Sequence, residues 1–169
     1  FASVTYGAGG STREGTLAAA RELKKRFKEG VPHVSCYGSD KASIFELLKT
    51  YSNDGFSRLV VLRGDLPSGY GGLGEFKNAV DLVRFVRREF GKQFKIEVAA
   101  YPEKHPQSPS FEQDIDYFVE KVDAGADGAI TQYFYNSDAY FSFVDEVHSR
   151  GVSVPIIPGI MPITNFSQL

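Results

Sequence analysis

Cysteine is nearly absent from this sequence, as are charged blocks and long apolar runs. Cys36 is the single cysteine among 169 residues, so the chain can form neither an internal disulfide nor a thiolate metal cluster. The formal net charge is -2, with dispersed lysines and arginines, which argues against a nucleic acid or a membrane surface as partner. No segment approaches the roughly 18 apolar residues of a membrane span. We therefore expect a soluble protein of a reducing, cytoplasmic compartment.

Recognisable ligand motifs are also missing. No GxGxxG turn follows the first expected strand, and the stretch GYGGLG at 69–74 lacks the Lys-Ser/Thr of a P-loop. His33, His105 and His148 fall on different elements, so no metal site is expected.

What is present is an ordinary globular composition, with 42% hydrophobic and 24% charged residues, enough for one core. The chain opens in a strand-like segment without an initiator Met and closes inside what resembles a beginning helix. We interpret residues 1–169 as part of one domain in a longer protein.

Extended apolar stretches alternate six times with amphipathic ones. The expected strands lie in FASVTY, VPHVSC, RLVVLRGD, KIEVAAYPE, GAITQYFY and VPIIPGI. Expected helices follow the first five, in REGTLAAARELKKRF, KASIFELLKTYSNDG, EFKNAVDLVRFVRREFG, SFEQDIDYFVEKVDAG and DAYFSFVDEVHSRG. Val80, Val83 and Val86 recur at helical spacing, which predicts one apolar face. Glycines that can close a helix in the left-handed conformation follow four of these stretches: Gly55, Gly91, Gly125 and Gly151.

Strict alternation predicts an α/β fold with a parallel sheet, either open and doubly wound or closed as a (β/α)8 TIM barrel. Polar residues follow nearly every expected strand rather than gathering at a single switch point, which favours the barrel. About six of the eight units would then be present, and the first and closing units would lie outside the chain.

The strand RLVVL runs into Arg63, Gly64 and Asp65, at the end where barrel enzymes build their sites. A charged group beside a buried strand needs a partner to offset desolvation. Arg63 and Asp65 lie on the same side of the strand, either as a structural ion pair or as site residues; an exposed RGD adhesion loop does not fit this context. His33 reads as a hydrogen-bonded core histidine, and Cys36 as a small buried apolar residue.

Gln132 is a neutral amide among aromatic residues at another strand end, able to offer a donor and an acceptor to a heterocycle. The aromatic residues near it, Tyr133, Phe134 and Tyr140 among them, either pack the core and rim or stack a flat ligand.

Taken in order, the motifs VTYGA, PHVSC, VLRGDLP, VAAYPEKHP, KVDAGADGAITQYFY and IIPGIMPITNF resemble those of the methylenetetrahydrofolate reductase family. The resemblance covers essentially the whole chain. It implies a flavin-bearing barrel that reduces 5,10-methylenetetrahydrofolate to 5-methyltetrahydrofolate, with FAD as cofactor, NADH or NADPH as hydride donor, and a homo-oligomeric assembly without nucleic-acid or membrane partners.

The resemblance also assigns residues. Asp65 would be catalytic, a negative charge beside the flavin ring and the folate pterin, and Lys121 would meet the pyrophosphate. The FAD-binding positions would be Thr5, Tyr6, His33, Arg63, Gly64, Asp65, Tyr101, His105, Asp114 and Lys121. The folate-binding positions would be Asp65, Gln132, Tyr140 and Gln168.

Three positions depart from the family pattern: Asn78, Tyr117 and Glu120 stand where an aromatic or His, an Asn and an Arg are common. They bear on the adenine and phosphate end of the FAD site. The family's general acid, a glutamate, would precede Phe1.

Two other functions stay open from the residues alone. One is a non-redox aldolase or lyase with Lys121 or Lys104 as amine nucleophile, although the first lies in a helical pattern and the second in a loop rather than at a strand end. The other is an inactive binding module. A yellow colour of the purified protein would separate the flavoenzyme from both.

Overall fold

The computed structural model describes residues 1–5, 13–64 and 74–162, where strands and helices alternate along the chain. The strands are β1 (Ala2–Val4), β2 (Gly30–Ser35), β3 (Arg58–Leu62), β4 (Lys95–Ala100), β5 (Gly128–Tyr133) and β6 (Ile156–Gly159). The helices are α1 (Arg13–Arg26), α2 (Lys41–Asn53), α3 (Ala79–Phe90), α4 (Phe111–Asp123) and α5 (Ser137–Ser149). The predicted alternation is confirmed.

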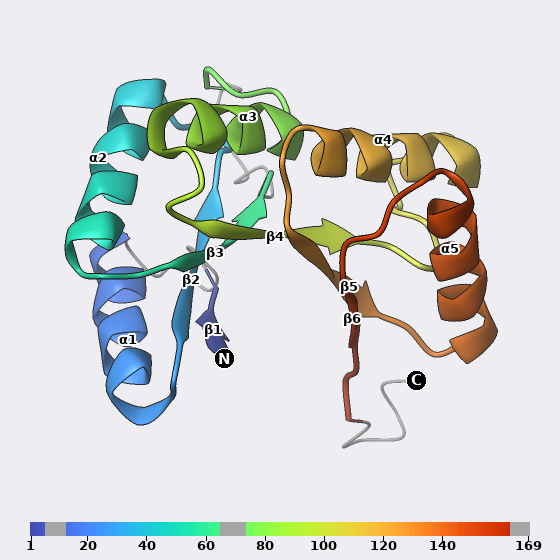
Figure 1. The fold of residues 1–169 in the computed structure, drawn as a ribbon, viewed down its shortest axis with the longest axis horizontal. Coiled ribbons are helices and arrows are strands. Elements are labelled where there is room, and N and C mark those ends of the chain that lie inside the picture. Colours follow the sequence, from blue (N-terminus) through green and yellow to red (C-terminus); the bar gives the residue numbers. More distant parts are fainter. Residues whose placement is uncertain (6–12, 65–73, 163–169) are drawn as a thin grey trace.

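All strands belong to one parallel sheet whose spatial order follows the chain order, β1-β2-β3-β4-β5-β6. A doubly wound sheet would reverse its order at a switch point, and this sheet does not. Figure 1 shows it curled, with the helices along its outer side. The described chain is therefore a half-barrel, as the strand-end pattern predicted.

The hydrophobic core fills the space between the sheet and the helices. Leu59 and Val61 face it from β3, and Val83 and Val86 face it from α3, all fully buried, while Val80 is 5% exposed at the start of that helix. Cys36 is fully buried in the same core, as predicted, and burial raises the pKa of its thiol to about 11. Every second residue of a strand therefore packs outward, and the residues between line the inner face.

Local hydrogen bonds set the helix ends. Asp40, Asn78, Ser110 and Asn136 cap α2, α3, α4 and α5 by accepting a backbone N–H with the side chain. Helix α3 therefore begins at Ala79, later than the stretch EFKNAV suggested. The glycines predicted to close helices all take the left-handed region, Gly55 at φ 71°, Gly91 at 55°, Gly125 at 116° and Gly151 at 83°.

A row of paired residues crosses the inner face: His33, Val60, Glu97 and Gly128, one from each of β2 to β5. Glu97 is 2% exposed, and its Oε1 accepts a hydrogen bond from Arg58 Nη1 at 2.9 Å. Gly128 makes room for this carboxylate, because a Cβ there would lie 2.2 Å from Glu97 Oε2.

A second charged cluster closes the amino-terminal end of the strands. Arg87, in the last turn of α3, donates to the carbonyls of Gly91, Phe94 and Gly125. It also meets the carboxylate of Asp127, which accepts the backbone N–H of Ile96 at 2.7 Å. These contacts join α3 to the starts of β4 and β5.

None of the helices within the described ranges is long and apolar enough to cross a membrane. The same residues contain no group of three or more His, Cys, Asp or Glu side chains that could hold a metal ion.

Candidate active site at the carboxyl ends of the strands

The strand register brings the carboxyl ends of β2 to β5 to one rim of the half-barrel. Ser35 pairs with Leu62, Val61 with Val98, and Ala100 with Thr131. The segments that follow these strands contain most of the predicted site residues, so residues far apart in sequence become neighbours there.

The exit of β3 is held by β2. The carbonyl oxygen of Arg63 accepts hydrogen bonds from Ser35 Oγ and from the backbone N–H of Tyr37, both at 2.9 Å. Gly64 follows at φ 86°, and a Cβ there would lie 1.9 Å from Ser35 Oγ. Only glycine fits this turn, which fixes the direction in which the Arg63 side chain leaves the strand.

The Arg63 guanidinium contacts neutral oxygens. Its Nη2 donates to Gln107 Oε1 at 2.5 Å and its Nε to the Gly64 carbonyl at 3.4 Å. No described carboxylate forms an ion pair with it. Asp65, its proposed partner in a structural pair, lies outside the described residues. Within the described part of the chain, Arg63 keeps an uncompensated positive charge at the rim.

The segment between β4 and α4 is organised around Asp114, in the first turn of α4 and 8% exposed. Its Oδ2 accepts the backbone N–H of His105 at 3.0 Å, and its Oδ1 accepts Ser108 Oγ at 2.7 Å. The His105 ring packs edge-on against Tyr101, with centroids 4.5 Å apart. Asp114 therefore acts on the predicted site by fixing the loop that carries His105.

Lys121 brings a cation to the same rim from the outer layer. It lies on α4, and its Nζ donates to the Ala99 carbonyl at 2.5 Å, near the end of β4. Burial lowers the pKa of its ammonium group to about 8, although the nearby Asp114 carboxylate acts in the opposite direction. The interpretation that its helical position keeps it from the strand ends is therefore too simple, because the long side chain reaches one.

His33 differs from its prediction. It lies on the inner face of β2, but neither ring nitrogen has a hydrogen-bond partner among the described residues. The predicted hydrogen-bonded core histidine is wrong in that respect, and burial lowers the pKa of the ring to about 4. A buried neutral imidazole with both nitrogens unmatched has unused hydrogen-bonding capacity.

Gln132 is exposed at the end of β5, and its Oε1 accepts the backbone N–H of Tyr133 at 3.0 Å. The ladder to β6 shifts register here, and Thr131 Oγ1 accepts the backbone N–H of Gly159 at 2.8 Å. Tyr140 donates to the Ile156 carbonyl at 2.9 Å and stacks on Phe134, with ring planes 9° apart. Tyr140 thus packs the β5–α5 corner, while the Gln132 side chain stands at its surface.

The other predicted site residues lie away from this group or outside the described residues. The carbonyl of Thr5, at the end of β1, accepts the hydroxyl of Thr16 at 3.3 Å. Tyr6, Asp65 and Gln168 lie outside the described residues. Hydrogen bonds and a ring contact link Arg63, Tyr101, His105 and Asp114 across the ends of β3 and β4, and Lys121 contacts the end of β4; we call these five residues the rim cluster. Gln107 and Ser108 complete this group and were missed, although their place directly after YPEKHP is a signal that could have found them.

The departures from the family pattern have local explanations. Asn78 caps α3, and its side chain accepts the backbone N–H of Asp81 at 3.1 Å. Glu120 pairs with Arg84 at 2.9 Å on the surface, and Tyr117 is 47% exposed on the same helix. None of these side chains has a described contact with the rim cluster.

Comparison with known proteins gives a consistent result. The sequence model described as methylenetetrahydrofolate reductase matches residues 1–169. Proteins called 5,10-methylenetetrahydrofolate reductase from Salmonella typhimurium and Escherichia coli are each 41% identical to the chain over 169 residues, covering 99% of it and 56% of their own length. A probable methylenetetrahydrofolate reductase (NADH) from Oryza sativa is 38% identical over 180 residues, covering 98% of the chain and 30% of the relative. The chain thus spans about half the length of its bacterial relatives.

Similar solved structures support the fold alone. A phosphonopyruvate hydrolase complex with oxalate and Mg++ aligns with a TM-score of 0.67 at 14% identity, over 88% of this chain and 52% of that one. A 2,3-dimethylmalate lyase aligns with a TM-score of 0.57 at 13% identity, over 87% and 59%. At such low identity these lyase and hydrolase names say nothing of this chain's chemistry.

Proposed function

Because the chain belongs to the methylenetetrahydrofolate reductase family, we propose that the complete protein reduces 5,10-methylenetetrahydrofolate to 5-methyltetrahydrofolate, with FAD as cofactor and NADH or NADPH as hydride donor. We further propose a homo-oligomer in the cytoplasm. The observation that carries the function is the rim cluster, in which Arg63 and Lys121 present positive charge through contacts with neutral oxygens.

The residues of the half-barrel fit a flavin dinucleotide. Arg63 and Lys121 suit anionic or carbonyl oxygens, and the unmatched nitrogens of His33 suit a polar ring edge. Bound FAD would accept a hydride from the nicotinamide and deliver it to the folate. This chemistry requires a redox cofactor rather than an amine nucleophile, so the family assignment speaks against the aldolase or lyase alternative.

Each rim residue has a proposed role. Lys121 holds the pyrophosphate, Arg63 and the Gly64 turn meet the flavin, and Asp114 fixes the loop with Tyr101 and His105 against it. The other FAD contacts are proposed at Thr5, Tyr6, His33 and Asp65. For folate we propose Asp65, Gln132, Tyr140 and Gln168, with Asp65 as the catalytic carboxylate beside the reacting rings.

The proposal is tested first by FAD titration of the complete protein stripped of flavin. Because the pKa of Lys121 is about 8, its ammonium should lose its proton as pH rises through that value, and FAD affinity should fall. Lys121→Met should weaken FAD binding about tenfold at pH 7, the usual size of a lost charged hydrogen bond, and should remove that pH dependence. Lys92→Met, an exposed lysine at the opposite end of the strands, serves as control. A folded wild-type protein that takes up no FAD would contradict the proposal.

The folate assignment is tested at Gln132. Gln132→Glu keeps the size and an acceptor but loses the NH2 donors and adds a charge beside aromatic residues, so folate affinity should fall about tenfold. FAD content should stay at the wild-type level. Gln93→Glu, exposed near the start of β4, is the matched control. If folate affinity and FAD content fall together, Gln132 supports the fold or the cofactor instead of the substrate.

A further inference from the structure

The Gln107 side chain joins the segments that follow β3 and β4 at the rim. Its side-chain Oε1 accepts Arg63 Nη2 at 2.5 Å, and its backbone N–H donates to His105 Nδ1 at 3.0 Å. The side chain itself is exposed, so burial does not account for its position.

The backbone contact determines which nitrogen of His105 carries the proton. A nitrogen that accepts a hydrogen bond cannot be protonated, so the neutral ring must carry its hydrogen on Nε2. In the neutral ring, Nε2 is therefore a donor and Nδ1 is the acceptor of the Gln107 N–H, while the Asp114 carboxylate holds the backbone of His105.

The side-chain contact has an electrostatic consequence. An amide oxygen orients the guanidinium without cancelling its charge, whereas a carboxylate at the same place would form an ion pair. Arg58 and Arg87 also have largely buried side chains, but they lie nearer the starts of the strands. Each of them forms an ion pair with a carboxylate. Within the ranges that the structure describes, Arg63 is directed by neutral partners instead.

We propose that Gln107 is a positioning residue of this site. Its side chain aims the Arg63 guanidinium, its backbone N–H sets the His105 tautomer, and its neutral amide orients Arg63 toward an electron-rich ligand edge without adding a negative charge. This inference rests on the proposed FAD site and concerns what tunes it. Gln107 acts through Arg63 and need not touch the ligand.

The test is a double-mutant cycle on the complete protein, with the FAD dissociation constant as readout. Gln107→Glu should weaken FAD binding about tenfold in the wild-type background, because the new carboxylate neutralises Arg63. In an Arg63→Gln background the same change should alter binding less than about twofold. Gln107→Ala, which frees the guanidinium without neutralising it, should fall between, and its apoprotein should melt within about 2 °C of wild type.

Two further measurements separate positioning from a structural role. The nitrogen chemical shifts of His105 should report a proton on Nε2 in wild type and in Gln107→Ala, since the backbone donor is retained. Bound flavin should become harder to reduce in Gln107→Glu than in Gln107→Ala. Equal FAD affinity of wild type and Gln107→Glu, or an equal effect of that change in both backgrounds, overturns the inference while leaving the proposed function standing. Wild-type protein that binds no FAD would contradict both this inference and the proposed function.

Discussion

Buried and half-buried cations have different partners at the two ends of the half-barrel. Where the strands begin, Arg58 lies between Glu97 and Glu29, and Arg87 meets Asp127. Where they end, Arg63 and Lys121 contact an amide and carbonyls. Among the described residues, the cations at the first end form ion pairs with carboxylates, and those at the second end donate hydrogen bonds to neutral oxygens.

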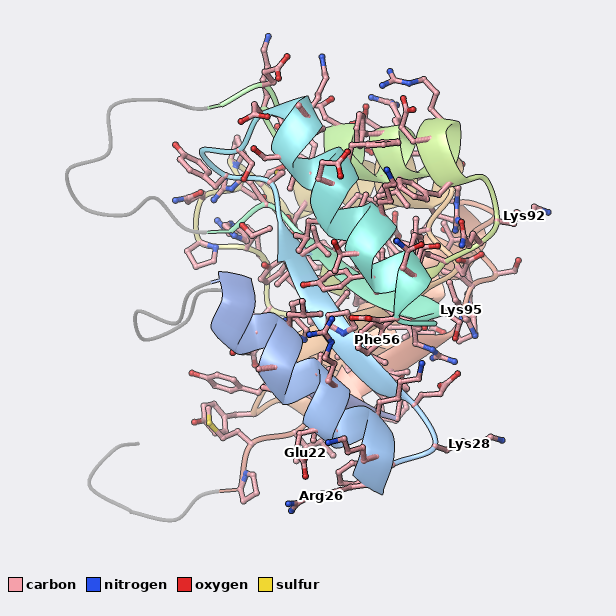
Figure 2. All side chains as sticks on the ribbon, turned by 90° about the vertical axis from the view of Figure 1, so that its left-hand side faces the viewer. Glu22, Arg26, Lys28, Phe56, Lys92 and Lys95 are labelled. Atoms are coloured by element: carbon pink, nitrogen blue, oxygen red, sulfur yellow. The ribbon has the colours of Figure 1, made fainter. Side chains whose placement is uncertain are left out.

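The exposed residues follow the same division. Figure 2 shows Lys28, Lys92 and Lys95 along the edge where β2 and β4 begin, and all three are exposed. Solvated lysines at that edge keep their charge at little cost, because water screens them. Cations with buried stems at the opposite edge are costly unless they find an anion, which is why we propose that the end where the strands finish binds a ligand and that the end where they begin stabilises the fold.

The largest effect is expected on stability, from a substitution at the end where the strands begin. Arg58→Met leaves the Glu97 carboxylate buried without its cation, which typically costs about 3 to 5 kcal/mol of unfolding free energy. Burial already raises the pKa of Glu97 above its ordinary value, so the folded state binds that proton more tightly than the unfolded chain. The loss should therefore be largest at neutral pH and shrink as pH falls through the Glu97 pKa.

Urea unfolding of the complete protein at several pH values measures this loss. The control is the double variant Arg58→Met with Glu97→Met, which removes both charges and should recover most of the stability. FAD affinity of the folded fraction should stay unchanged in both variants. A large loss of FAD affinity in either variant would show that the two ends of the strands do not act independently.

A smaller effect is expected at His33. Its pKa of about 4 in the folded state lies below the 6.5 of a free imidazole, so the unfolded chain binds more protons between these values. Its contribution to stability is then fully present above pH 6.5 and is lost as pH falls through 4. His33→Leu should flatten the stability profile in that window and weaken FAD binding. Unfolding curves from acid to neutral pH that match wild type would contradict the buried neutral ring.

The smallest expected effect concerns the corner that presents Gln132. Thr131→Val keeps the shape but removes the acceptor for the Gly159 N–H, at a cost of about 1 kcal/mol. Because this bond lies where β5 and β6 change register, folate affinity should also fall by a few-fold. Thr50→Val, whose hydroxyl contacts a carbonyl of its own helix, is the control and should leave folate binding at the wild-type level.

Much of the fold was predictable because it depends on local patterns. Valines at helical spacing identified the buried face of α3, and glycines in the left-handed region followed four helices as expected. The order of polar residues after the strands favoured the barrel. The late start of α3 was missed, since the capping residue Asn78 lies inside an otherwise continuous helical pattern.

The residues that follow the strand ends were predictable from the sequence, but the contacts among them were not. A strand-end location marks Arg63 and His105 as candidates, yet the bridge through Gln107 depends on how two loops meet in space. The unmatched ring of His33 and the pair between Arg58 and Glu97 depend on register, because neighbouring strands determine which inner-face residues meet. The hydrophobic pattern shows which strand residues share a face, but it does not identify their partners on the neighbouring strand.

The contact between Glu97 and Gly128 makes the residue at one position depend on the residue at the other. A Cβ at 128 would lie 2.2 Å from Glu97 Oε2, so a side chain there requires the carboxylate to move or position 97 to be smaller. Moving the carboxylate would disturb its hydrogen bond with Arg58. The charged interior therefore depends on the absence of a side chain at 128 on the neighbouring strand.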